Sequence, residues 1–215
     1  MKPKNLLIIF VCVGFAFAVL LFLSHKHSAT GSTKGSFYLN ASYDDMRRVL
    51  LTNDCTAELI EKQHGRVIKQ EWEDLSIGWN HLNTDRLLSS FDVDGKGYYK
   101  VEVNDPEAGT LVLQFQQTVA VRKNHLESVT SLMYPSGALK KYVTTMMLTR
   151  EGSRTKVDLT VYLEYSRRLP VTHRGYMENK VQEASDAGWH KVQQGLSLVV
   201  EKYKDRLFTI PLKRK

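Results

Sequence analysis

The alternation of apolar and polar positions is clearest in the last third of the chain. Between Arg154 and Tyr165, apolar side chains occupy every second position, which is typical of a strand with one buried face. From Thr172 to Lys204, small and apolar residues recur at steps of three and four, which predicts one long amphipathic helix. A long helix that directly follows a strand must lie across the sheet to bury its apolar stripe. The predicted stripe comprises Met177, Val181, Ala184, Gly188, Val192, Gly195 or Leu196, Val199 and Tyr203.

The middle of the chain repeats the strand pattern in short segments that are separated by turn signals. Asp94-Gly95, Pro135-Ser136-Gly137 and Glu151-Gly152-Ser153 carry the residues that tight turns prefer. Connections of this length predict an antiparallel meander of six strands. The predicted strands are Arg86–Val93, Tyr98–Val103, Thr110–Val121, Leu126–Tyr134, Leu139–Arg150 and Arg154–Tyr165.

Two short helices are predicted upstream of the meander, after a first strand over Ser36–Ala41. Ser42 and Asp45 have the spacing of a capping box for a helix over Tyr43–Thr52. A second helix is predicted over Thr56–Gln63. The segment 66–85 is too apolar for an exposed loop, and we expect it to pack as an irregular segment, a strand or a helix.

The N-terminus contains an uninterrupted apolar run, Leu6–Leu23. As a helix it would be roughly 27 Å long, close to the hydrocarbon thickness of a bilayer, and it exceeds the apolar core of a cleavable signal peptide. It therefore predicts an uncleaved single-pass anchor over residues 1–23. Lys2 and Lys4 on one side balance Lys26 and Lys34 on the other, so charge leaves the orientation open, and the short N-terminus favours the domain on the non-cytoplasmic side. Residues 24–35 are rich in Ser, Thr, Gly and His and predict a flexible linker before a domain over 36–205 and a basic tail over 206–215.

The net charge of +7 is concentrated at the two ends of the chain. Without Lys2, Lys4, Lys26, Lys34 and the three basic residues at 213–215, segment 36–212 has 23 basic and 23 acidic residues. A formally neutral domain argues against nucleic-acid binding, which requires a basic surface. The terminal charges suit anionic lipid headgroups, although the tail could equally serve solubility.

The order of strand, two short helices, six antiparallel strands and long C-terminal helix resembles the helix-grip fold of the START-like superfamily, which includes the polyketide cyclase families. The resemblance covers about residues 36–204. The stretch Gly152-Ser153-Arg154-Thr155-Lys156-Val157 is loosely similar to the Gly-x-Thr-x-Val pattern of such proteins. The resemblance implies an α+β domain, with a curved antiparallel sheet of about seven strands wrapped on the C-terminal helix.

A sheet that grips a helix in this way leaves a space suited to a lipid or another hydrophobic small molecule. Small residues on the helix would keep that space open, or would instead allow close packing of helix and sheet. Ten residues are the candidate ligand contacts: Leu113, Phe115, Val119, Met146, Val161, Leu163, Tyr165, Ala184, Gly188 and Gly195.

No nucleophile motif, phosphate loop or zinc spacing occurs, so neither catalytic residues nor a metal or cofactor is predicted. Alternation places Glu164 and Asp158 on the polar face of the last strand. A register slip of one residue would instead put Glu164 and Tyr162 inside as acid–base candidates.

Three hypotheses follow from this reading. The first is a membrane-anchored module that binds a hydrophobic molecule. The second is a cyclase- or hydratase-type enzyme on the same fold. The third is an interaction protein with a collapsed cavity, whose protein partner the sequence does not identify.

Overall fold

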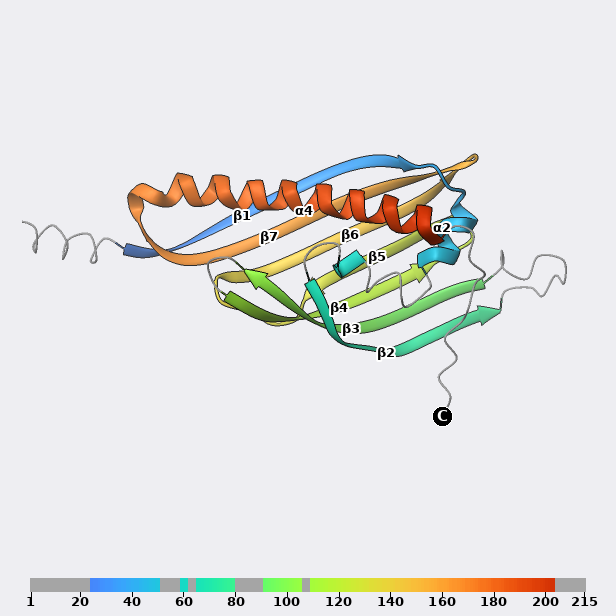
Figure 1. The fold of residues 1–215 in the computed structure, drawn as a ribbon, viewed down its shortest axis with the longest axis horizontal. Coiled ribbons are helices and arrows are strands. Elements are labelled where there is room, and N and C mark those ends of the chain that lie inside the picture. Colours follow the sequence, from blue (N-terminus) through green and yellow to red (C-terminus); the bar gives the residue numbers. More distant parts are fainter. Residues whose placement is uncertain (1–23, 51–58, 62–64, 80–90, 106–108, 204–215) are drawn as a thin grey trace, which may run out of the picture.

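The computed structural model describes residues 24–50, 59–61, 65–79, 91–105 and 109–203. Its strands form one antiparallel sheet in the order β1-β7-β6-β5-β4-β3-β2, and the long helix α4 lies across one side of it (Figure 1). The elements are β1 (Ser24–Leu39), α2 (Tyr43–Leu50), β2 (Gly65–Trp79), β3 (Phe91–Asp105), β4 (Gly109–Val121), β5 (His125–Leu132), β6 (Leu139–Glu151), β7 (Arg154–Pro170), the 3-10 turn η1 (Val171–His173) and α4 (Arg174–Tyr203).

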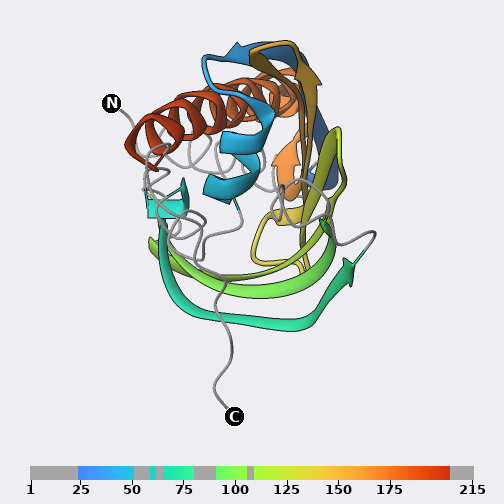
Figure 2. The same cartoon turned by 90° about the vertical axis from the view of Figure 1, so that its right-hand side faces the viewer.

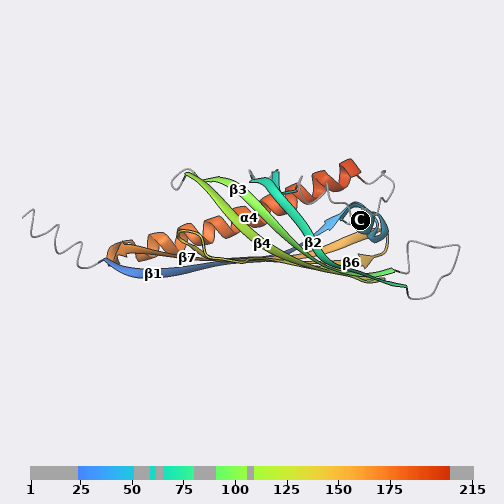
Figure 3. The same cartoon turned by 90° about the horizontal axis from the view of Figure 1, so that it is seen from below.

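The sheet is strongly curved, and α4 lies on its concave side (Figure 2). The helix packs on β1 and β7, while β2, β3 and β4 diverge from it (Figure 3). This arrangement confirms the predicted α+β architecture, with a seven-stranded antiparallel sheet and a long C-terminal helix. The helix begins at Arg174, because Val171–His173 form the 3-10 turn.

The predicted hairpin between Arg86–Val93 and Tyr98–Val103 is wrong. Asp94-Gly95 is not a turn, because β3 continues through it and pairs with β2 on one side and β4 on the other. The second strand of the predicted hairpin is instead supplied by Gly65–Trp79, from the segment that the sequence left ambiguous.

The predicted linker is also wrong, since residues 24–35 form most of β1 and pair with β7 along their whole length. The glycines that suggested flexibility are places of close approach to α4. A Cβ atom at Gly31 would overlap the backbone carbonyl of Val181, and one at Gly35 would lie 2.7 Å from Cζ2 of Trp189. These glycines therefore let the helix lie directly on β1.

The predicted anchor over 1–23 and the tail over 206–215 lie outside the described residues. Of the helices in the described ranges, none combines the length and hydropathy needed to cross a bilayer.

The start of α2 agrees with the predicted capping box. The backbone amide of Asp45 donates to Oγ of Ser42 at 3.2 Å, and the amide of Met46 donates to the Ser42 carbonyl at 3.0 Å. Next to the cap, the Tyr43 hydroxyl donates to the carbonyl of Arg122 at 2.7 Å, and burial raises the pKa of Tyr43 to about 12. Helix α2 is thus fastened to the β4–β5 turn at one end of the sheet.

Polar side chains attach α4 to the sheet. Oγ of Ser185 donates to the carbonyl of Val161 at 3.0 Å, and Nε1 of Trp189 donates to the carbonyl of Leu159 at 3.1 Å. The Thr33 hydroxyl of β1 donates to Oδ1 of Asp186 at 2.6 Å. The helix therefore meets β1 and β7 through hydrogen bonds as well as through its apolar stripe.

Substituting Gly31 with alanine tests the close approach of α4 to β1. Because the Val181 carbonyl cannot move without the helix backbone, we expect Gly31→Ala to lower the free energy of unfolding by about 1–3 kcal/mol. Urea denaturation of the full-length protein, followed by circular dichroism, measures this effect.

Gly175→Ala is the matched control, since nothing lies within 4 Å of a Cβ at this position near the start of α4. We expect it to raise the free energy of unfolding by up to about 1 kcal/mol, because alanine is the better helix former. Equal unfolding midpoints for the two variants would contradict the proposed contact.

Candidate functional site

The pairing register identifies the side chains that face α4. Val161 of β7 faces the helix, because its Cγ1 would lie 3.5 Å from a Cβ at Gly188. Directly paired residues share a face of a sheet, so every cross-strand partner in the same row faces inward with Val161. This row, which we call the middle row, crosses six strands and comprises Val161, Thr144, Thr130, Gln117, Gly97 and Trp72.

Apolar clusters flank the middle row on both sides. The first apolar cluster surrounds α2 and the C-terminal half of α4; its buried members are Leu39, Ala41, Tyr43, Met46, Val93, Val121, Leu126, Leu148, Val157, Leu196, Val199 and Val200. The second apolar cluster lies under the N-terminal half of α4; its buried members are Ala29, Leu113, Leu139, Leu163, Met177 and Val181. The concave face is thus apolar at both ends and more polar in the middle.

A chain of hydrogen bonds runs through this polar middle. The buried Tyr99 hydroxyl donates to Oε1 of Gln117 at 2.7 Å. In turn, Nε2 of Gln117 donates to Oγ of Ser128 at 2.9 Å, and Ser128 is also buried. The bonds connect β3, β4 and β5 and hold the Gln117 amide in one orientation.

Trp72 lies beside this chain with an unused hydrogen-bond donor. Its indole covers Gly97, where a Cβ would come within 3.1 Å of the ring, and it meets Tyr99 edge-to-face at a centroid distance of 6.1 Å. The Nε1 atom is buried and has no hydrogen-bond partner among the described residues. A buried donor without a partner costs about 1–3 kcal/mol, so an acceptor supplied from outside the chain would be stabilised here.

Thr144 is a second polar group of the middle row. Its hydroxyl is buried and makes no hydrogen bond of normal geometry within the described part of the chain. Burial raises the pKa of the adjacent Tyr142, and the nearness of the Thr144 hydroxyl offsets part of that rise. Both side chains face the same space as Trp72.

The centre of the concave face is only partly covered by α4. Leu126, Leu148 and Val157 of the first apolar cluster are almost completely buried. By contrast, Thr130 and Gln117, which also face the helix, are half-buried. The middle row at β4 and β5 is therefore less completely enclosed than the first apolar cluster.

The structure brings the seven strand residues predicted as ligand contacts to this one face; they are Leu113, Phe115, Val119, Met146, Val161, Leu163 and Tyr165. Of the three helix residues, Gly188 lies against Val161, and Gly195 is buried against Leu59. Ala184, one turn before Gly188, is exposed.

Sequence reasoning missed the polar residues of the site, although a signal for them exists. Gln117 is the one polar residue on the inner face of β4 between Leu111 and Val121. In the next two strands, Ser128, Thr130 and Thr144 likewise interrupt inward-facing apolar positions. A polar residue at corresponding rows of three adjacent strands indicates a polar site within the apolar face.

In the middle row and the two rows beside it, the described strands β3 to β7 present no carboxylate, lysine, arginine or histidine on the inner face. Arg150, the partner of Thr155 at the end of the sheet, does face inward, and it forms an ion pair with Asp44 of α2 at 2.7 Å. Glu164 pairs with Thr30 and Lys141 on the outer face, so the register slip that would place it inside does not occur. Asp158 is also outside, where it forms an ion pair with Lys156 at 3.2 Å and accepts a hydrogen bond from Ser36. These contacts lower the pKa of Asp158.

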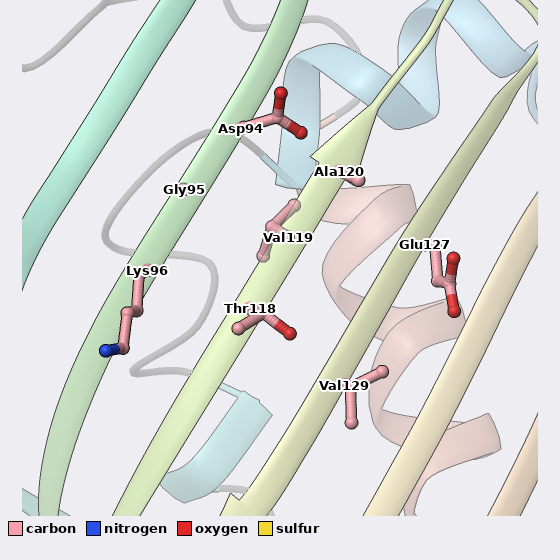
Figure 4. A pocket seen from close by; sticks show the side chains of 8 residues that line it. All are labelled: Asp94, Gly95, Lys96, Thr118, Val119, Ala120, Glu127 and Val129. Atoms are coloured by element: carbon pink, nitrogen blue, oxygen red, sulfur yellow. The ribbon is translucent and has the colours of Figure 1, made fainter.

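A separate hollow of about 390 Å³ lies on the outer face of the sheet, with α2 and α4 behind the strands (Figure 4). Asp94 and Glu127 stand on either side of Ala120, two strand spacings or roughly 10 Å apart. Asp94 forms an ion pair with Arg122 at 2.8 Å, so its charge is already neutralised. In the described residues, no group of acidic, histidine or cysteine side chains is suited to hold a metal ion.

Comparisons with known proteins support the fold. No family model and no curated protein matches the sequence. Among solved structures, SA2116 from Staphylococcus aureus, a protein of unknown function, is 10% identical with a TM-score of 0.50, and the match covers 84% of this chain and 99% of that one. This match supports the fold alone, which is the antiparallel seven-stranded sheet with a long C-terminal helix that the helix-grip resemblance implied.

Two further structures match at lower TM-scores. The ZhuI aromatase/cyclase from Streptomyces sp. R1128 is 10% identical with a TM-score of 0.48, over 82% of this chain and 94% of that one. TTHA0849 from Thermus thermophilus is 14% identical with a TM-score of 0.47, over 80% of this chain and 97% of that one.

Replacing Gln117 with leucine tests the hydrogen-bond chain. Gln117→Leu keeps the approximate volume but removes the acceptor of Tyr99 and the donor to Ser128, so we expect a loss of about 1–3 kcal/mol in the free energy of unfolding. Gln116→Leu makes the same change on the outer face and should stay within about 0.5 kcal/mol of the wild type.

The double variant Tyr99→Phe/Gln117→Leu should lose less stability than the sum of the two single variants, because the two residues contact each other. Urea denaturation curves of the four proteins measure this coupling. Strict additivity would show that the hydrogen bond does not stabilise the fold.

Proposed function

We propose that the protein binds a lipid-like small molecule that is mainly apolar and carries a hydrogen-bond acceptor. The observation that carries this proposal is the buried Nε1–H of Trp72, which has no partner in the described part of the chain. It lies in a polar row between two apolar clusters. Sites for apolar ligands have this composition, with a few placed polar groups on a largely apolar lining.

The chemistry of the middle row suggests what the ligand carries. Trp72 can only donate a hydrogen bond, so its partner is an oxygen acceptor such as a carbonyl, an ester or an ether. The central rows of the inner face offer no cation to an anionic ligand, and Arg150 at the end of the sheet is already paired with Asp44. A neutral acceptor on an apolar body therefore suits the site better than a phosphate or a free carboxylate.

The N-terminal apolar run supports the further proposal that this activity takes place at a membrane. In our proposal, Leu6–Leu23 anchors the protein in a single pass and the domain lies on the non-cytoplasmic side. The ten predicted contacts then form the apolar walls around the middle row. An apolar ligand would reach such a domain from the adjoining bilayer.

The two alternatives have less support. A cyclase- or hydratase-type enzyme needs ionisable groups that converge on the ligand, and the central rows of the described inner strand faces offer only tyrosine phenols. An interaction protein with a collapsed interior would bury the middle row completely, whereas Thr130 and Gln117 are half-buried.

Placing a large side chain in the middle row should block the ligand. We expect Thr130→Phe to weaken binding at least about tenfold, because the ring would occupy the space over β5. Thr118→Phe is the matched control on the outer face and should bind as the wild type does. Native mass spectrometry of the detergent-purified protein with its co-purifying lipids gives the readout, and a fluorescent sterol and a fluorescent diacylglycerol provide titrations.

If neither probe binds and no lipid co-purifies, the proposed function is wrong. Equal losses in the Thr130 and Thr118 variants would place the ligand away from the concave face.

Trp72→Phe separates binding from folding. The substitution removes the donor and keeps an aromatic ring over Gly97, so we expect the free energy of unfolding to stay within about 1 kcal/mol of the wild type. Affinity for an acceptor-bearing lipid should fall about tenfold, the value of one hydrogen bond. Unchanged affinity in the same titration would remove Trp72 from the site.

A further inference from the structure

One end of the molecule carries basic side chains from three elements. Here β1 and β7 extend beyond the rest of the sheet, since β6 pairs with β7 only as far as Tyr165 whereas β1 follows it to Pro170 (Figure 1). We call residues 24–28 and 166–176 the basic tip. Its charged side chains are Lys26, Arg167, Arg168 and Arg174, and its sequence contains no aspartate or glutamate.

The strand register places like charges against each other within the tip. Lys26 is the direct partner of Arg168, and His27 is the direct partner of Arg167. Like charges directly opposite each other destabilise a strand pair. Neither Lys26 nor Arg168 forms an ion pair with another residue of the described ranges, and both are exposed. Such an arrangement is stabilised when an anionic surface covers it.

The tip is also where the chain enters the domain. Strand β1 is paired from Ser24 onward, and the apolar run Leu6–Leu23 ends at the preceding residue. With that run in a bilayer, no linker separates the tip from the lipid headgroups. This step rests on the anchor of the proposed function. Tyr176 is 63% exposed on the first turn of α4, and tyrosine is a residue type that favours the membrane interface.

We propose that the basic tip docks on the surface of an anionic lipid bilayer. Lipid phosphate and serine headgroups would neutralise Lys26 and Arg168, each of which is attracted to a negative surface potential. Arg174 already forms an ion pair with Glu178 at 3.0 Å and contributes less. The docking would orient the long axis of α4 away from the membrane, with its N-terminus nearest the lipid. The near-neutral sum of charges over the domain does not reveal this surface, because Arg168 comes to lie opposite Lys26 only in the folded sheet.

Fluorescence quenching in vesicles tests the docking. The full-length chain, with Tyr176→Cys as the labelled position and both native cysteines replaced by alanine, is reconstituted into phosphatidylcholine alone or mixed two to one with phosphatidylserine. Quenching by headgroup nitroxides should be stronger in the anionic vesicles. It should fall as salt rises from about 0.01 M to about 1 M, where the Debye length shrinks from about 30 Å to about 3 Å.

Lys26→Glu gives the sharper comparison. It replaces a repulsive pair by an ion pair with Arg168, so the unfolding midpoint should be unchanged or higher while the quenching falls to the level of phosphatidylcholine vesicles. Lys123→Glu is the charge-matched control, because Lys123 is exposed in the β4–β5 turn at the opposite end of the sheet. It should leave the quenching as in the wild type.

The outcomes separate docking from anchoring. Equal quenching in both kinds of vesicle, or equal loss in the Lys26 and Lys123 variants, would overturn the proposed docking. Extraction of the chain by alkaline carbonate would refute the anchor of the proposed function. Phosphatidylserine-dependent quenching in the vesicles before extraction would still support the tip as a lipid-binding surface.

Discussion

The attachment of α4 to β1 and β7 determines the shape of the rest of the domain. Gly31 and Gly35 allow the helix to lie directly on β1, and Ser185 and Trp189 bond it to the backbone of β7. Because the helix is held at one side of the sheet, the strands farther from β1 can curve away from it. The inner face is therefore closed at both ends by two apolar clusters and is less completely buried in the middle. The position of the candidate site follows from this asymmetry.

The sequence predicted the elements whose periodicity is strong. The alternation in β7 and the stripe of α4 reflect one buried face each, and the Ser42 cap has a local chemical signature. By contrast, residues 24–35 have the composition of a linker, and only their pairing with β7 and contact with α4 make them a strand. Asp94-Gly95 has the composition of a turn, but pairing with strands on both sides keeps it extended. Tertiary contacts outweighed local preference at both places.

In the candidate site, too, the sequence predicted which face a residue occupies but not which residues of neighbouring strands lie side by side. Strand alternation placed the apolar walls, such as Phe115 and Val161, on the correct face. It could not align Gln117 with Thr130 and Thr144, because that alignment depends on the register between strands. Trp72 belongs to the site because it lies on β2, and the sequence alone did not identify β2 as a strand. The polar groups of the candidate site thus lie in the part of the fold that periodicity alone does not determine.

The immediate start of β1 at Ser24 has a consequence for transport. Twelve flexible residues would give a tethered domain a reach of roughly 20 Å, enough to leave the headgroup region and search its surroundings. A paired strand does not allow this reach, so the anchor that we propose for Leu6–Leu23 would keep the domain at the surface of its own bilayer. It would exchange ligand with that membrane, or with a carrier that comes to it, rather than shuttle across the gap to a second membrane.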